Sequence, residues 1–168
     1  MRHLAILPAL LLASCGAQEP TPEDLAANAE RDVAMVEEAN NAPPPVRPVL
    51  PEPITFQDIE EHSILGAACN YAPGTSLGTR IIAREADAFA KLEGEVIRFA
   101  ADAGSSELPA KSWSDYDGRE FSLRLAVEGE GRSAGGNGGK TNYTGTIDMR
   151  DRWNRPVYNG TGLVQCDT

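Results

Sequence analysis

The chain is poor in the residue types that most hydrolases and metal sites use. Its 168 residues include two histidines, three cysteines and 6% aromatic residues. A Ser-His-Asp triad would have to be built on His62, since His3 lies in the first few residues. The sequence has no Gly-x-Ser-x-Gly elbow and no closely spaced Cys and His pair. We therefore expect no enzyme, no cofactor and no metal site, and we interpret His62 as a surface residue beside Glu60 and Glu61.

Positive charge and long apolar runs are also scarce. The chain has 15 Lys and Arg against 25 Asp and Glu, a formal net charge of -10. A surface of this kind stays soluble and repels nucleic acid, so we expect no nucleic-acid partner. A cationic protein and another envelope protein both remain candidate partners. No apolar run reaches the roughly 20 residues that a membrane-spanning helix needs.

The first residues have the pattern of an export signal. Arg2 supplies a positive start, residues 4–13 are apolar, and small residues follow. We predict that residues 1–14 are a signal peptide. An ordinary secretory signal, cut near Ala13 or Ala17, is the alternative.

The run Leu12-Ala13-Ser14-Cys15 resembles a bacterial lipobox. The resemblance implies that Cys15 becomes the first mature residue and carries acyl chains, palmitate among them. Two or more such chains give stable anchoring where one does not. Gly16 follows the cysteine, and resemblance to lipoprotein sorting then implies the outer membrane. We expect the rest of the chain on the periplasmic face rather than at the cell surface.

Two cysteines remain once Cys15 is assigned to lipid. Cys69 and Cys166 would lie in an oxidising compartment, so we predict that they form a disulfide between the first and last core strands. The bridge would close a loop of roughly 100 residues, for which the chain-entropy treatment gives about 4–5 kcal/mol of stabilisation. A metal pair or a reactive thiol is the alternative, but neither cysteine has a His or second Cys at ligand spacing.

Residues 15–53 are predicted to be a tether. Thr21 and Pro22, followed by acids, have the signature of a helix start, and a helix rich in Ala and Glu is expected to about Glu38. Residues 43–53 contain prolines at a density that favours extended polyproline II backbone. This segment is expected to be a semi-rigid stalk.

Residues 54–168 have the pattern of an all-β domain. A single helical turn capped by Thr55 is expected first, and short strands joined by turn residues follow. Phe121, Leu123 and Leu125 alternate with polar residues, which is the clearest strand pattern in the chain. Asn159-Gly160 is expected to interrupt the last strand. About six or seven strands in this length predict a small antiparallel sandwich or barrel.

Three other patterns resemble functional motifs but have simpler interpretations. Residues 134–141 fit a loose phosphate-loop pattern, but a strand pattern follows instead of a helix, so a hairpin loop is predicted. Asp115-Tyr116-Asp117-Gly118 resembles part of a calcium loop that lacks its first and last ligands, and we interpret Asp117-Gly118 instead as a turn into the strand that begins at Phe121. Trp113 and Trp153 lie near turns, where they would either pack or form an exposed aromatic patch.

Much of the β domain resembles a group of small bacterial envelope lipoproteins whose activity is unknown. The residues that carry this resemblance are Cys69, 92–98, 116–118, 121–125 and 157–166. The chain is also similar to membrane-bound lysozyme inhibitors, which are small disulfide-linked barrels on a lipid anchor, although it lacks their Ser-Gly-x-x-Tyr loop. We therefore expect a lipid-anchored envelope protein with a non-enzymatic domain of binding or structural type. An inhibitor of lysozyme is the alternative.

Overall fold

The computed structural model describes residues 20–76, 78–135 and 139–167. The signal peptide predicted for residues 1–14 and the lipidation predicted at Cys15 lie outside the described residues. The chain divides into two compact units between Pro44 and Pro45, and each unit is described by itself. No described helix combines the length and the apolar character needed to cross a membrane.

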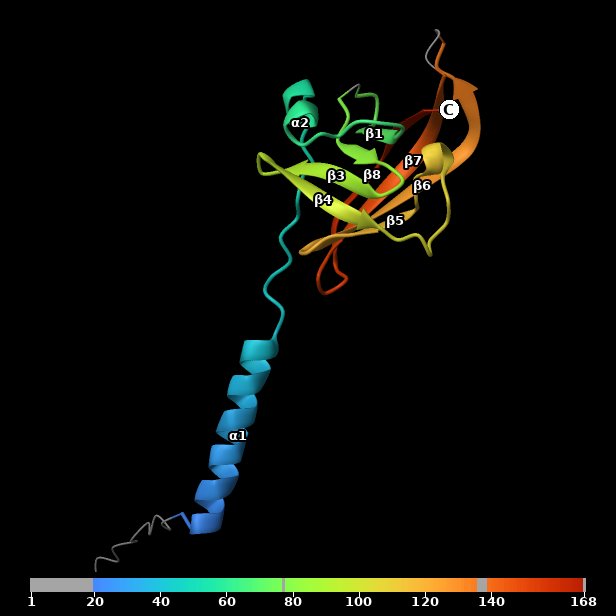
Figure 1. Ribbon diagram of the computed structural model, residues 1–168. Coiled ribbons are helices and arrows are strands. Elements are labelled where there is room, and N and C mark those ends of the chain that lie inside the picture. Colours follow the sequence, from blue (N-terminus) through green and yellow to red (C-terminus); the bar gives the residue numbers. More distant parts are fainter. Residues whose placement is uncertain (1–19, 77, 136–138, 168) are drawn as a thin grey trace, which may run out of the picture. The chain divides into compact units, whose positions relative to one another are not determined.

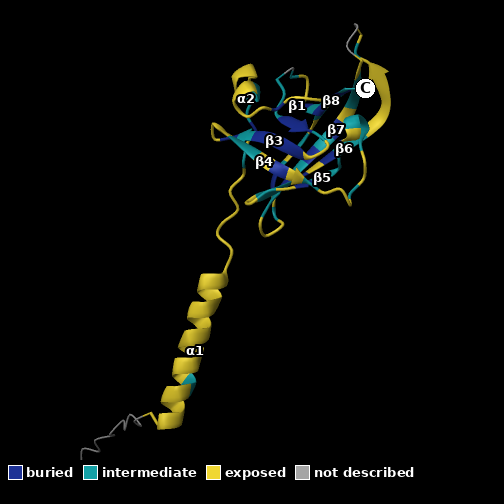
Figure 2. Cartoon of the chain, in the orientation of Figure 1, coloured by how far each residue is buried: buried dark blue, intermediate teal, exposed yellow. Residues whose placement is uncertain are grey.

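The first unit contains the helix α1 (Pro22–Asn41). The Asp24 N–H donates to the Thr21 hydroxyl at 3.2 Å, and the Thr21 N–H donates to the Asp24 carboxylate at 3.0 Å. This reciprocal capping box, with Pro22 in the first turn, agrees with the predicted start. The helix continues past the expected end at Glu38. No residue of α1 is buried, and Figure 2 colours it almost wholly as exposed.

The second unit is built on a closed barrel of antiparallel strands (Figure 1). Each strand pairs with the next along the chain, and β8 pairs with β1. The strands are β1 (Cys69–Pro73), β2 (Ile81–Ala83), β3 (Asp87–Leu92), β4 (Glu95–Ala101), β5 (Asp115–Asp117), β6 (Phe121–Ser133), β7 (Lys140–Asp151) and β8 (Pro156–Asp167). The predicted all-β barrel is confirmed, with eight strands in place of six or seven. The extra strand is β5, for which sequence analysis predicts no strand, whereas the predicted turn at Asp117-Gly118 leads into β6, with the Gly118 N–H donating to Phe121 O at 2.9 Å.

Alternating side chains fill the inside of the barrel. Leu123 and Leu125 are buried, whereas Arg124 between them is exposed, as a period of two predicts. An eight-stranded barrel is just wide enough for side chains to fill it. The largest fully buried side chains of the interior cluster are Tyr71, Tyr116, Phe99, Ile81, Leu123, Leu125, Ile147, Met149 and Val164.

Each end of the barrel is covered by a segment from outside the sheet. Where β8 finishes, Leu108 and Ala110 pack against the interior cluster from the loop that contains the 3-10 turn η1 (Pro109–Lys111). Where β8 begins, Val49 packs against the same cluster, and its N–H donates to Val157 O at 3.0 Å. Among the described residues the interior is therefore a packed core, and the hollows described below lie on the outer surface.

Residues 45–54 form a strap that is bonded to the barrel. Beyond Val49, the Glu52 N–H donates to Lys91 O at 2.7 Å, and the Ile54 N–H donates to Thr79 O at 2.8 Å. Through Glu52 the strap makes an antiparallel bridge with β3. Strands β8 and β3 and the loop before β2 thus hold the chain before it enters the barrel.

The strap changes the boundary between tether and domain. Sequence analysis assigned residues 15–53 to the tether, whereas the contacts divide the chain at Pro45. Pro51 is fully buried, and the Arg80 guanidinium donates to its carbonyl. The prolines do favour extended backbone, but extended backbone also pairs along a strand, and the partner strand lies far away in the sequence.

Helix α2 (Phe56–Glu61) lies on the outside of the barrel and starts, as expected, at a Thr55 cap. The Thr55 N–H donates to Asp58 Oδ2 at 2.7 Å, and Lys91 Nζ lies 2.8 Å from Asp58 Oδ1. These hydrogen bonds from Lys91 and Thr55 lower the pKa of Asp58 to about 2. The cap of α2 is therefore also an ion pair with β3.

An apolar cluster lies beneath α2, on the outer face of β2 and β3. Ile82 and Phe89 are outward side chains of these strands, and the segment that precedes β1 covers them with Ile54, Ile64 and Ala68. Burial of such side chains contributes about 1.5–3 kcal/mol each. The second unit therefore has cores on both sides of part of its sheet.

Cys69 and Cys166 lie directly opposite each other on β1 and β8 and form the predicted disulfide. Their Cα atoms are 4.0 Å apart, and both residues are fully buried. The bridge therefore lies on the seam that closes the barrel, between its first and last strands.

The expected break at Asn159-Gly160 is wrong, because β8 continues through it. Gly160 is required there by a close approach. A Cβ at Gly160 would clash with the Tyr158 hydroxyl and would lie 2.7 Å from the Tyr71 hydroxyl. The glycine makes room for two tyrosines rather than a turn. The irregularity in this hairpin lies instead between Met149 and Arg150, where the register shifts.

Candidate functional site

The outer face of β5, β6 and β7 carries a hollow of about 800 Å³, called here the outer groove. Outward side chains of three neighbouring strands line it, together with the loop before β5 and the turn after β7. Its lining residues are Asp102, Ser105, Asp115, Tyr116, Asp117, Ser122, Leu123, Arg124, Asp148, Arg150 and Asn154. Polar and charged residues dominate this list.

A row of charged side chains crosses the floor of the outer groove. Asp115 lies opposite Arg124 on β6, and Arg124 lies opposite Asp148 on β7. Arg124 Nε donates to Asp115 Oδ1 at 2.8 Å, and Ser114 Oγ donates to Asp115 Oδ2 at 2.6 Å. Arg150 Nε donates to Asp148 Oδ1 at 2.6 Å. The strand register thus alternates negative and positive charge across the sheet.

Asp115 and Arg124 stabilise each other's charged forms. Burial disfavours the ionised form of Asp115, but hydrogen bonds from Ser114 and Arg124 outweigh it, so the pKa of Asp115 lies below its ordinary value. The same hydrogen bond raises the pKa of Arg124. Arg124 and Arg150 each form an ion pair with an aspartate of the groove. Asp117, by contrast, is exposed and forms no ion pair with any residue the structure describes. The groove therefore offers a partner more acceptors than donors.

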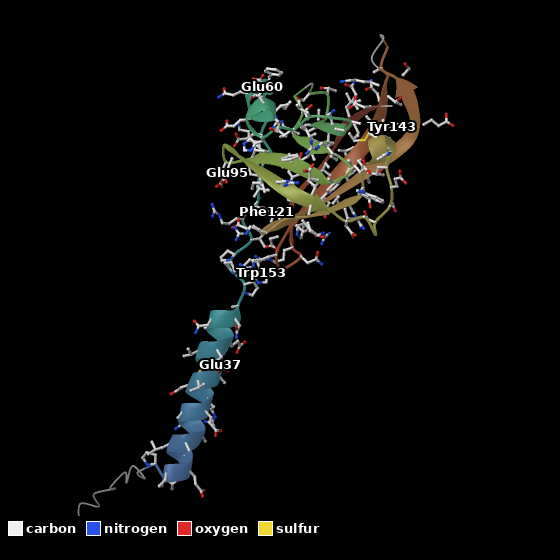
Figure 3. All side chains as sticks on the ribbon, viewed as in Figure 1. Glu37, Glu60, Glu95, Phe121, Tyr143 and Trp153 are labelled. Carbon is white, nitrogen blue, oxygen red and sulfur yellow. A yellow bond between two sulfur atoms is a disulfide. The ribbon has the colours of Figure 1, made fainter. Side chains whose placement is uncertain are left out.

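A rigid turn between β7 and β8 lies at one end of the groove, which Asn154 helps to line. The Asp151 carboxylate accepts the Trp153 N–H at 3.0 Å, the Arg155 N–H at 2.9 Å and Arg155 Nε at 2.7 Å. Trp153 is 42% exposed at the tip of the turn (Figure 3). The guanidiniums of Arg152 and Arg155 lie 5.2 and 4.9 Å from the centre of its ring. These contacts hold an exposed indole in one position.

The two tryptophans do not form a joint patch. Trp113 donates from Nε1 to Glu85 O at 2.9 Å, in the turn between β2 and β3. That turn lies at the disulfide end of the barrel, whereas Trp153 lies at the opposite end, before β8 begins. Trp113 is half-buried and packs against the interior cluster.

The other candidate residues are spread over the chain. His62 caps the C-terminus of α2 and is exposed. Residues 134–139 link β6 to β7, as a hairpin loop was predicted to do, and residues 136–138 of that loop lie outside the described residues. Residues 115–117, weighed as part of a calcium loop, form β5. In the described part of the chain, no group of three or more His, Cys, Asp or Glu is arranged to hold a metal ion.

Sequence analysis missed the charged row on the outer face of the barrel. The signal was present in Asp115-Tyr116-Asp117, where two acids flank a buried tyrosine with a period of two. Three residues are too few for that period to be distinguished from a turn. The partners of Asp115 on β6 and β7 follow only from the strand register. No protein-family model, curated protein or solved structure matches this chain.

Proposed function

We propose that this chain is a lipid-anchored protein of the bacterial cell envelope with a non-enzymatic barrel of binding or structural type. Cys15 carries the acyl chains, and the barrel lies on the periplasmic side of the outer membrane. The support is the basic start at Arg2, the short apolar run and the Leu12-Ala13-Ser14-Cys15 sequence before Gly16. The proposal includes no cofactor and no nucleic acid.

The observation that carries the binding role is the packed interior with both ends covered. Barrels of this size that hold a ligand keep space inside for it, whereas here Leu108 and Val49 close the two ends over a filled core. Recognition is therefore assigned to the outer groove. A 20-residue helix such as α1 is about 30 Å long and serves as a spacer between anchor and barrel.

Replacement of Cys15 tests the anchor. Cys15→Ala is expected to abolish acyl labelling and to release the protein from the membrane fraction, because the lipid has no other attachment point. Cys166→Ala is the matched control and should keep the label. Labelling that persists in Cys15→Ala would overturn the proposal.

Charge reversal in the groove tests the binding role. A strain that lacks the protein would be complemented with the wild type, Asp117→Arg or Glu95→Arg, and envelope permeability to a dye would be measured. We expect Asp117→Arg to fail and Glu95→Arg, an equal change on exposed β4, to complement. Equal complementation by both variants would remove the groove from the proposal.

The acid excess of the groove favours a second candidate, an inhibitor of lysozyme. Four aspartates and two arginines line the groove, and a cationic enzyme would be drawn to such a surface. The test is inhibition of lysozyme by purified residues 45–168. Inhibition that Asp117→Asn weakens would favour this candidate, and its absence at molar excess would favour the first.

A further inference from the structure

A second hollow, called here the disulfide-end hollow, shares no residue with the outer groove. It has a volume of about 640 Å³, within the range of small-molecule sites. Its walls come from three loops and the end of β8. The lining residues are Leu65, Gly66, Ala67, Arg84, Glu85, Ala86, Ala110, Lys111 and Asp167. Leu65 is 72% exposed, so an apolar ligand here would remove a costly exposed side chain from water.

The loops around this hollow are braced from behind. Arg84 NH1 donates to Leu65 O at 2.7 Å, and Arg84 is itself held by buried Asp87, with Nε 2.7 Å from Oδ1. The Tyr116 hydroxyl donates to Arg84 O at 2.9 Å, and Trp113 Nε1 donates to Glu85 O at 2.9 Å. The walls are therefore ordered before a ligand arrives, which lowers the entropy cost of binding.

The same bonds occupy four of the wall carbonyls. Those of Leu65, Arg84 and Glu85 accept from the side chains above, and that of Ala86 accepts from the Ala101 N–H. By contrast, the backbone N–H groups of four wall residues donate to no residue that the structure describes. These residues are Gly66, Ala67, Glu85 and Ala86.

Lys111 adds a positive charge to these donors. Its ammonium forms no ion pair within the described part of the chain. Lys111 and Ala110 both have left-handed backbone, with φ of 54° and 58°, a strained conformation for non-glycine residues that clusters at functional sites. Of the two rim carboxylates, Asp167 is engaged by the Ala68 N–H at 3.0 Å, and Glu85 is exposed.

We propose that the disulfide-end hollow binds a small amphiphile with an apolar chain and a single anionic head, a phosphate or carboxylate. The alanines and Leu65 cover the chain. Lys111 and the free N–H groups recognise the head, since backbone amides and an ammonium are the donors that suit an anion. This site is independent of the outer groove and of the lipid on Cys15.

Trp113 reports on the site, since its indole is bonded to the Glu85 wall. The experiment uses residues 45–168, which keep the whole core because no residue of α1 is buried. Trp153→Phe leaves Trp113 as the single indole. Dodecyl phosphate, kept below its micelle concentration, is titrated while Trp113 emission is followed. We expect saturable binding with one site per chain.

Charge variants then test recognition of the anionic head separately from recognition of the apolar chain. Lys111→Gln should weaken binding about tenfold or more, because a charge-assisted contact is lost. Lys111→Arg should retain affinity, and Glu85→Gln should tighten it. Arg119→Gln, which removes one positive charge at the opposite end of the barrel, is the matched control. Unfolding in urea verifies that each variant is folded.

Three results would overturn the proposal. Equal binding of neutral dodecyl maltoside would mean that no anionic head is recognised. Equal binding of inorganic phosphate would mean that the chain contributes nothing. Unchanged affinity in folded Lys111→Gln would remove the residue on which head recognition depends.

Discussion

Helices α1 and α2 begin with the same local motif and end in different surroundings. Both have a threonine cap whose partner is an aspartate three residues on, at Thr21 with Asp24 and at Thr55 with Asp58. Only Asp58 has a second partner, Lys91 on β3. A capping box therefore decides where a helix starts, and a contact distant in sequence decides whether that helix belongs to a core.

Charge density separates the two units in the same way. Residues 22–41 contain six acids and one arginine, and residues 45–168 contain 18 acids and 13 bases, so each segment carries a net charge of -5. The helix concentrates that charge in a sixth of the length. The barrel, by contrast, pairs part of its charge across strands, with Arg98–Asp87, Arg124–Asp115 and Lys140–Asp167.

The largest expected effect comes from the seam of the barrel. Cys69→Ala combined with Cys166→Ala should lower the unfolding free energy of residues 45–168 by about 4 kcal/mol, because the unfolded chain regains loop entropy. Urea unfolding followed by fluorescence measures it. In the full chain, NMR signals of Leu25 and Val33 on α1 should not move. An unchanged urea midpoint in the double variant would show that β1 and β8 close the barrel without help from the disulfide.

The buried acid on the outer face should give the next largest effect. Asp87 is 2% exposed, and it holds Arg84 and Arg98 through both carboxylate oxygens. Asp87→Ala should cost about 3 kcal/mol of unfolding free energy, since it leaves two arginines unpaired. Asp148→Ala is the matched control and breaks a more exposed pair, for less than about 1 kcal/mol. Equal losses would contradict this ranking.

Low pH is expected to destabilise the barrel through the capping box of α2 and not through that of α1. The folded state holds the pKa of Asp58 at about 2, below its ordinary 3.8, so the stabilising charge is present above pH 4 and is lost as pH falls towards 2. The unfolding midpoint of the barrel should fall across that window, and Asp58→Asn should flatten this part of the slope. Asp24 also has a lowered pKa, from its hydrogen bonds with Thr21, yet Asp24→Asn should leave the barrel midpoint unchanged. An equal response to both would place α1 in the barrel's core.

The smallest effect is expected on the exposed apolar residues of α1. Leu25→Gln combined with Val33→Gln should change the unfolding free energy of the barrel by less than about 0.5 kcal/mol, because neither side chain is buried. Thermal unfolding of the full chain measures it. A clear fall in the midpoint would reveal packing between the units.

Features that leave a local or compositional signal were predictable from the sequence. They include the helix caps at Thr21 and Thr55, the alternation along β6, and the disulfide between the two cysteines that remain after Cys15. Strand β5 left only a three-residue alternation, which is too short to establish a period, and the strand exists because β4 and β6 pair with it on either side.

The site depends even more on distant partners. Asp115 and Arg124 meet because the turn between β5 and β6 sets their register, and Asp148 joins them from the next strand. The strap was assigned to the tether for the same reason, because Val49 and Glu52 bond to residues 157 and 91. No pattern within residues 45–54 indicates those partners.

The strap also decides how the barrel meets mechanical force. A pull from the N-terminal side reaches the second unit first at the exposed Arg47–Glu93 ion pair and then at Val49, Glu52 and Ile54, each of which donates one backbone hydrogen bond. Because these bonds lie one after another along the chain, they take the load in turn and break singly. The disulfide between β1 and β8 is loaded only after all three have opened. The strap is therefore expected to detach before the barrel itself opens when the chain is pulled from its N-terminal side.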